Sequence, residues 1–124
     1  MAKPTLLKIK KSRNFKMITE FGKKDVRKGL ILQVYEKPDN INNTSQNIRF
    51  GITASKKIGK AVIRNRARRR LNALANTVLT NSAKTSNDYV LIARNVTANM
   101  KYYNLEEDLR KALSILGCIR NTKL

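Results

Sequence analysis

The chain has 124 residues, enough for one domain with a modest core and too few for two. Its 27 Lys and Arg against 8 Asp and Glu give a formal net charge of +19, which favours polyanionic partners and disfavours cationic ones. A single cysteine, Cys118, and no histidine exclude an internal disulfide, a cysteine metal cluster and a histidine general base. We expect Cys118 to be a buried or half-buried apolar side chain.

The N-terminal stretch MAKPTLLKIKKSRNF is basic and lacks the apolar core of a secretory signal. No stretch of the chain approaches the ~18 apolar residues that cross a membrane. We therefore expect a cytoplasmic protein with no membrane partner. Residues 1–11 are predicted to form a basic flexible arm that becomes ordered on a partner. The cations in and next to this arm are Lys3, Lys8, Lys10, Lys11 and Arg13.

The first predicted element is a short helix over residues 12–21, SRNFKMITEF. Ser12 can cap its start, and Phe15 and Ile18 lie on one face at helical spacing. Gly22 is placed to end it.

Two β-prone runs follow, LILQVYE at residues 30–36 and IRFGITAS at residues 48–55. The segment between them, PDNINNTSQN, is polar and rich in turn-forming residues. These runs predict an antiparallel pair of strands with a long connection.

From Ala61 the apolar residues recur at helical spacing, which predicts the main helix over residues 61–81. The predicted inward positions are Ile63, Ala67, Leu71, Leu74, Ala75, Val78 and Leu79. DYVLIAR at residues 88–94 predicts a short buried strand. A last helix is expected to begin at Asn104, with Glu107 at the capping-box position. Helices packed on one sheet, an α/β sandwich in a single domain over residues 1–124, are the simplest assembly of these elements.

The main helix carries a dense group of cations at its start, in SKKIGKAVIRNRARRRL at residues 55–71. No acid occurs between Asp39 and Asp88, so the group has no nearby counterion in sequence. Most of the charges are arginines, whose planar fork binds phosphate in a bidentate manner. Like charges at i,i+4 each disfavour a helix by a few tenths of a kcal/mol. The pattern therefore favours a polyanionic partner over a merely solvated basic face.

RNRARRRL, with SKKIGKAV before it, resembles the signature of the bacterial ribonuclease P protein subunit. The resemblance extends over LKIKKSRNF, GLILQVY, RFGITASKK and YVLIAR, in the order found in that family. It implies an α+β sandwich with a central mixed sheet of about four strands packed by three helices. It also implies a left-handed βαβ crossover through the basic helix, as in the second domain of ribosomal protein S5.

The resemblance implies an accessory subunit without catalytic residues or a metal site of its own. In that family a catalytic RNA removes the 5′ leader of precursor tRNA, with Mg²⁺ held mainly by RNA. The free protein would be a monomer, and its partners would be the catalytic RNA and precursor tRNA. The residues implied to hold the catalytic RNA are Lys56, Lys57, Lys60, Arg64, Asn65, Arg66, Arg68, Arg69 and Arg70. Those implied to line the leader cleft are Phe15, Thr53, Ser55 and Arg94.

Thr19 and Gln33 stand where many family members place aromatic residues, which weakens the expected stacking on the leader. Three other functions are open on the residues alone. A ribosomal or other structural rRNA-binding protein would share the charge and size. A helix-based DNA regulator is disfavoured by the absence of a compact helix-turn-helix. A self-sufficient nuclease is disfavoured because the acids are scattered.

Overall fold

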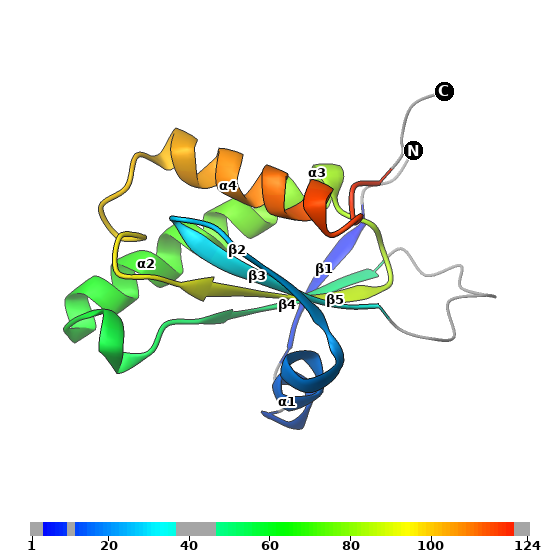
Figure 1. Cartoon of the computed structure of the whole chain (residues 1–124), viewed down its shortest axis with the longest axis horizontal. Helices are drawn as coiled ribbons and strands as arrows, with labels where there is room; N and C mark the ends of the chain where they lie inside the picture. Colours follow the sequence, from blue (N-terminus) through cyan, green and yellow to red (C-terminus); the bar gives the residue numbers. More distant parts are fainter. Residues whose placement is uncertain (1–3, 10–11, 37–46, 121–124) are drawn as a thin grey trace.

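The computed structural model describes residues 4–9, 12–36 and 47–120. A five-stranded sheet forms the middle layer, in the order β1-β4-β5-β3-β2. Helix α1 covers one face, and α2 and α4 cover the other (Figure 1). The strands are β1 (Thr5–Lys8), β2 (Lys23–Val26), β3 (Leu30–Glu36), β4 (Asn47–Thr53) and β5 (Asn87–Ala93). The helical elements are α1 (Ser12–Phe21), the 3₁₀ turn η2 (Lys56–Ile58), α2 (Ala61–Leu74), the π-helical segment η3 (Ala75–Leu79), α3 (Thr80–Ser82) and α4 (Tyr102–Ile115).

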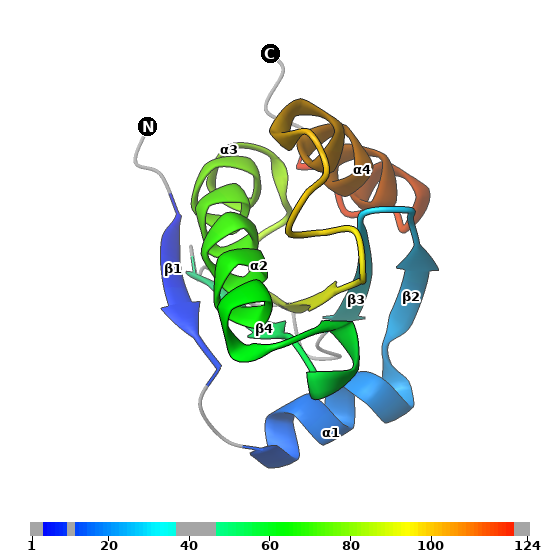
Figure 2. The ribbon, with the colours of Figure 1, turned by 90° about the vertical axis from the view of Figure 1, so that its left-hand side faces the viewer.

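The sheet is mixed, as the resemblance implies. Strands β4 and β5 are parallel neighbours, and the chain passes between them through α2, η3 and α3. Strand β1 is parallel to β4, whereas β3 is antiparallel to β5 and β2 is antiparallel to β3. Figure 2 shows β1 and β2 at the two edges of the sheet. The left-handed course of the crossover stays an implication of the resemblance.

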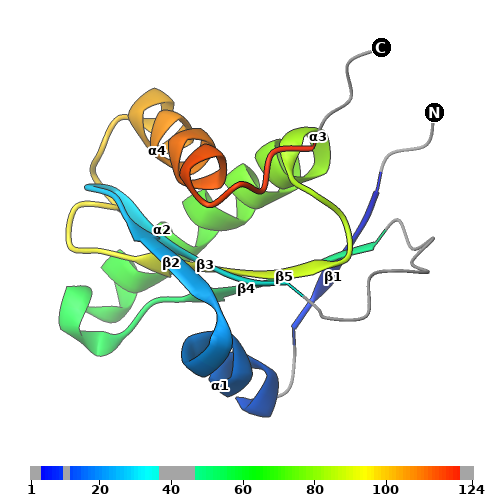
Figure 3. The same ribbon diagram turned by 45° about the vertical axis from the view of Figure 1, so that its right-hand side comes forward.

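The two faces of the sheet have cores of different size. The larger core lies between the sheet and helices α2 and α4, and β3 contributes Leu30, Leu32 and Val34 to it. The smaller one joins Ile18 of α1 to Val90 of β5. Figure 3 shows α1 alone on its side of the sheet. Strand β5 is buried on both faces because Tyr89 and Leu91 pack in the larger core and Val90 packs in the smaller one, which explains its nearly continuous apolar sequence.

The main helix agrees with its predicted extent, since α2, η3 and α3 form one helical run from Ala61 to Ser82. Its predicted stripe is buried, with Ala67, Leu71, Leu74, Ala75, Val78 and Leu79 in the larger core and Ile63 packed against it. No helix within the described ranges is long and apolar enough to cross a membrane.

Two strands were missed by the sequence analysis. Residues 5–8 of the predicted flexible arm form β1, because they pair in parallel with β4 and Leu6 packs against the larger core. Residues 1–3 and 10–11 of that arm, together with the Arg13 side chain, lie outside the described part. Strand β2, KKDV, lacks apolar alternation and is held at the edge by main-chain pairing with β3. The sheet therefore has five strands instead of about four.

The predicted pairing of residues 30–36 with residues 48–55 is wrong. These segments form β3 and β4, and β5 lies between them, paired with both. A short-range hairpin was the simplest prediction for neighbouring runs. Strand β5 instead takes the central position, and its side chains pack in the cores on both faces of the sheet.

The ends of α4 differ partly from the prediction. The helix begins at Tyr102, with Lys101 at the N-cap position and no side-chain cap, so the Asn104 capping box is absent. The Asn104 N–H instead donates to the Lys101 carbonyl at 2.9 Å, as in a first helical turn. After the helix, Gly117 takes a left-handed φ of 72°, which a glycine adopts without strain. Cys118 is fully buried, as expected, and burial raises the pKa of its thiol.

Candidate nucleic-acid interface

The turn before α2 presents three lysines to solvent. Lys56 and Lys57 lie in η2, and Lys60 is the residue before the first turn of α2. All three side chains are exposed. Gly59 between them has φ 147°, a conformation that favours glycine, and a Cβ there would come within 3.0 Å of Ile63 Cβ. This glycine lets the chain turn sharply into α2 and brings the lysines beside the arginines of the helix.

Helix α2 carries a group of cations, most of which are exposed to solvent. Asn65, Arg66, Arg68 and Arg69 are exposed, and Arg64 is half-buried. Within the part of the chain that the structure describes, the ion pairs are Lys23–Glu36, Arg27–Asp25, Arg49–Asp88 and Arg110–Glu106. None of these pairs reaches η2 or α2. The positive charge of η2 and α2 therefore has no ion-pair partner among the described residues.

Arg70 differs from its neighbours in its contacts within the protein. Its Nη1 donates to the Thr97 carbonyl at 2.8 Å, and its Nη2 donates to the Met100 carbonyl. The guanidinium also lies over the Tyr102 ring, 5.8 Å from its centroid. Burial, and then repulsion from Arg66, lowers the pKa of Arg70. This arginine ties α2 to the loop before α4 through two of its N–H donors.

Thr97 extends the same network to the sheet. This residue is fully buried, and its Oγ1 accepts from the Arg94 N–H at 2.7 Å and donates to the Gly29 carbonyl at 2.6 Å. The Arg94 guanidinium in turn donates to the Arg27 carbonyl at 2.6 Å. The loop after β5 is therefore held by α2 on one side and by the β2–β3 hairpin on the other. The sequence carries no periodic signal for Thr97, and its role was missed.

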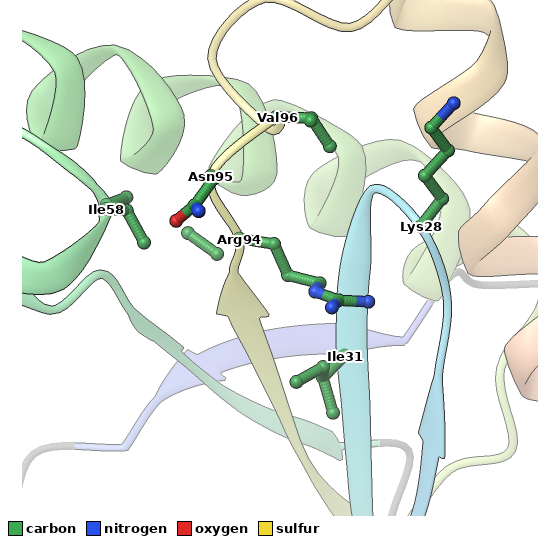
Figure 4. A pocket seen from close by; sticks show the side chains of 7 residues that line it. Lys28, Ile31, Ile58, Arg94, Asn95 and Val96 are labelled. Carbon is green, nitrogen blue, oxygen red and sulfur yellow. The ribbon is translucent and has the colours of Figure 1, made fainter.

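Arg94 lines a cavity of about 420 Å³ at the end of the sheet, which we call the Arg94 cavity. Figure 4 shows the Arg94 side chain extending from the end of β5 across the neighbouring strand, with Ile31 beneath it and Lys28 beyond. Ile58 and Val96 supply further apolar wall. The cavity thus combines apolar walls with two cations. Lys28 was not singled out by the sequence analysis, although it precedes the GLILQVY motif.

Phe15 lies elsewhere, in a second cavity of about 470 Å³ beside the end of β1 and the last part of β4. We call it the edge groove. Its lining includes Phe15 of α1, Gly51 and Ile52 of β4, and Arg68, Arg69 and Asn72 of α2. A Cβ at Gly51 would come within 2.4 Å of Phe15 Cζ, so the glycine is what lets the ring lie against the strand. The structure therefore places Phe15 beside the cations of α2, in a different cavity from Arg94.

The remaining predicted cleft residues lie at the end of β4. Thr53 is two residues from Gly51 and faces the same side of the sheet, while Ser55 is exposed just before η2. Thr19 is exposed and its Oγ1 donates to the Phe15 carbonyl at 3.0 Å, and Gln33 is buried. Neither offers an aromatic ring, as the sequence indicated.

Charge at the opposite end of β5 is neutralised. Arg49 donates through Nε and Nη2 to the two Asp88 carboxylate oxygens, at 2.9 and 2.7 Å. This hydrogen-bonded pair, more than burial, sets the pKa of Arg49, which is raised. Asp88 lies at the start of β5 and Arg94 just after its end. Unbalanced positive charge therefore concentrates at the end of β5 that lies near η2. Within the described residues no group of three or more Cys, Asp or Glu side chains could hold a metal ion.

The chain matches a family model described as Ribonuclease P over residues 4–117. It belongs to the ribonuclease P protein family. A ribonuclease P protein component from Paramagnetospirillum magneticum is 36% identical over 115 residues, covering 93% of this chain and 86% of the relative. One from Gluconacetobacter diazotrophicus is 36% identical over 110 residues, covering 89% and 90%. The chain thus matches proteins of this name over most of its own length and most of theirs.

Solved structures of ribonuclease P proteins share the fold. The Staphylococcus aureus protein matches with a TM-score of 0.72 at 23% identity, covering 91% of this chain and 97% of that one. The Thermotoga maritima protein matches with a TM-score of 0.67 at 20% identity, covering 88% and 94%. These likenesses confirm the α/β architecture that the resemblance implied.

Proposed function

We propose that this ribonuclease P protein binds the catalytic RNA through η2 and α2 and binds the 5′ leader of precursor tRNA on the α1 side of the sheet. It thereby assists endonucleolytic removal of the leader, which produces the mature 5′ end of the tRNA. The observation that carries the proposal is the exposed cationic surface of η2 and α2, which has no ion-pair partner among the described residues.

The surface that holds the catalytic RNA comprises Lys56, Lys57, Lys60, Arg64, Asn65, Arg66, Arg68 and Arg69. Arginine forks bind phosphate in a bidentate manner, and the lysines add compact point charges. Asn65 supplies a neutral donor and acceptor among the charges. Arg70 is assigned to holding the loop before α4, because its guanidinium donates to two main-chain carbonyls.

The leader is proposed to cross the sheet near Thr53, Ser55 and Arg94. The Arg94 cavity offers Lys28 and Arg94 for phosphates and Ile31 for an apolar base face. Phe15 lies at the border of this surface, because its cavity also contains Arg68 and Arg69. The resemblance implied that Phe15 binds the leader and that the basic helix binds the catalytic RNA. Residues of both groups line the edge groove.

In the proposed mechanism the protein screens the repulsion between the phosphates of two RNAs and positions them. Two RNAs repel each other through their phosphates, and cations fixed between them lower that repulsion where the protein contacts both. Each phosphate neutralised on a single strand contributes roughly −0.7 to the slope of log affinity against log salt, so about six contacts give a slope near −4. Mg²⁺ is proposed to act in the RNA-containing holoenzyme, and the protein would reduce the concentration needed. The free protein is proposed to be a cytoplasmic monomer.

The test is reconstitution of the chain with its cognate catalytic RNA and a precursor tRNA, scored for 5′ cleavage across Mg²⁺ concentrations. Cleavage at low Mg²⁺ should depend on the protein. An unchanged cleavage rate at low Mg²⁺ contradicts the proposal. Co-sedimentation with ribosomal subunits, in place of association with one catalytic RNA, would instead support a structural rRNA-binding role.

A further inference from the structure

Thr97 holds the main chain of Arg94 through two hydrogen bonds. Its Oγ1 accepts from the Arg94 N–H at 2.7 Å, and its own N–H donates to the Arg94 carbonyl at 3.0 Å. The chain from Arg94 to Thr97 therefore forms a closed turn directly after β5. Because Thr97 is fully buried, solvent does not compete for the bond that its hydroxyl makes.

The same hydroxyl joins this turn to the β2–β3 hairpin. Thr97 Oγ1 donates to the Gly29 carbonyl at 2.6 Å. Helix α4 holds the hairpin in turn, because the Gly29 N–H donates to the Asp108 carboxylate at 2.8 Å. A Cβ at Gly29 would come within 2.6 Å of the side chains of Leu105 and Met100, so the hairpin packs closely there. Thr97 thus connects the turn after β5 to a firmly packed part of the fold.

Both cations of the Arg94 cavity depend on this connection. The Arg94 Nη1 donates to the Arg27 carbonyl of the hairpin at 2.6 Å, which uses one of the five N–H donors of a guanidinium group. Lys28 lies between Arg27 and Gly29 in the chain. Arg94 and Lys28 line the same cavity (Figure 4). The Thr97 hydroxyl therefore sets where the Arg94 main chain lies relative to the segment that carries Lys28.

We propose that Thr97 is a positioning residue for leader binding, because its hydroxyl fixes Arg94 relative to Lys28 before the leader arrives. The two cations then meet phosphates of the single strand without being reordered, which lowers the entropy lost on binding. Thr97 acts through Arg94 and does not touch the leader, since its side chain is fully buried. This inference rests on the proposed function, in which Arg94 and Lys28 bind leader phosphates.

The first experiment uses holoenzymes reconstituted from full-length variants and the cognate catalytic RNA. It measures the affinity for precursor tRNA and for mature tRNA, which has no leader. Thr97→Val keeps the shape of the side chain and removes the hydroxyl, and should weaken binding of precursor tRNA by about 5-fold. Binding of mature tRNA should not change. Thr97→Ser restores the hydroxyl and should recover most of the lost affinity.

The affinity of the protein for the catalytic RNA is a second measurement on the same variants. Arg70 of α2 donates to the Thr97 carbonyl, which Thr97→Val keeps. The position of α2 should therefore be preserved, and the affinity of Thr97→Val for the catalytic RNA should equal that of the wild type.

Tyr89→Phe is the matched control for loss of stability. Tyr89 is also fully buried, and its hydroxyl donates to the Lys84 carbonyl at 2.6 Å. It lies near the start of β5, whereas the Arg94 cavity lies at the other end of this strand. Tyr89→Phe should lower the stability in urea unfolding and leave the affinity for precursor tRNA unchanged. If Thr97→Val does not fold, Thr97→Ala replaces it, because the smaller side chain leaves room for a water molecule beside the turn.

A double-mutant cycle tests whether Thr97 acts through Arg94. Arg94→Met alone should weaken binding of precursor tRNA by roughly 10- to 100-fold, because it removes a charged donor from a phosphate. In the Arg94→Met protein, Thr97→Val should weaken binding by less than about 2-fold more.

Three results would overturn the proposal. One is a cycle in which the losses of Thr97→Val and Arg94→Met multiply. Another is a Thr97→Val protein whose affinity for precursor tRNA is unchanged, or falls equally for mature tRNA. The third is a Tyr89→Phe protein that loses as much affinity for precursor tRNA as Thr97→Val does. Normal binding of precursor tRNA by Arg94→Met would instead contradict the leader surface of the proposed function, and is recognised from that single variant.

Discussion

Replacement of Arg70 by methionine separates a structural arginine from its RNA-facing neighbours. The variant loses two hydrogen bonds to main-chain carbonyls and one contact with the Tyr102 ring. A hydrogen bond to a charged group contributes about 1.5–3 kcal/mol, and a half-exposed cation–π contact about 0.5–1 kcal/mol. Methionine keeps apolar packing and helix propensity, and removal of the charge relieves a few tenths of a kcal/mol of repulsion from Arg66. Water replaces part of the lost bonding, so we expect a net loss of about 2–4 kcal/mol.

Arg69→Met is the matched variant, because Arg69 is exposed on the same helix and its replacement removes the same charge. Its free energy of unfolding should change by less than about 0.5 kcal/mol. Its binding to RNA should lose one phosphate contact, which lowers the slope of log affinity against log salt by roughly 0.7–0.9. Arg70→Met should leave that slope unchanged.

The assays are urea unfolding followed by circular dichroism, and titration of labelled catalytic RNA at several KCl concentrations. Arg70→Lys is a second comparison, because one ammonium group cannot reproduce the planar fork that reaches two carbonyls. It should recover no more than part of the lost stability. If Arg70→Met folds as stably as the wild type and lowers the salt slope as Arg69→Met does, the assignment of Arg70 to the loop is refuted.

Three further predictions concern the supports of the interface. Thr97→Val removes the hydroxyl that joins two buried main-chain groups, and should cost about 2–5 kcal/mol in urea unfolding; a loss below about 1 kcal/mol would show that the loop is held otherwise. Gly51→Ala places a methyl group within 2.4 Å of the Phe15 ring, so we expect a loss of about 1–3 kcal/mol and displaced Phe15 ring signals in NMR spectra; an unmoved ring would contradict the packing. Cys118 is fully buried with a raised thiol pKa, so a thiol reagent should react with it only after denaturation, and fast labelling of the native protein would contradict its burial. Because the unfolded thiol ionises first, this group's contribution to stability should be complete below its ordinary pKa of about 8.5 and decline as pH rises above it.

The sequence by itself determined the basic helix and its surface. The apolar period from Ala67 to Leu79 fixes which side of α2 faces the core, and the charged positions then have to face away. The same reasoning located the strands at residues 30–36 and 87–93 within one residue, because uninterrupted β-prone runs carry a strong local signal. The motif around Asn65 was specific enough to indicate the family, which the match over residues 4–117 confirms.

Only the tertiary structure decided the order of the strands in the sheet and which site residues lie together. Strand β1 and strand β2 are held at the sheet edges mainly by main-chain pairing, which leaves little pattern in their side chains. Arg70 is a further case, because two of its N–H groups donate to carbonyls 27 and 30 residues away, which its place among the arginines of the sequence does not indicate. Phe15 and Arg69 are far apart in the chain, and they line one groove because α1 and α2 both lie beside the last part of β4. Such contacts depend on how distant segments pack together, and periodicity along the chain reports only on each segment's own faces.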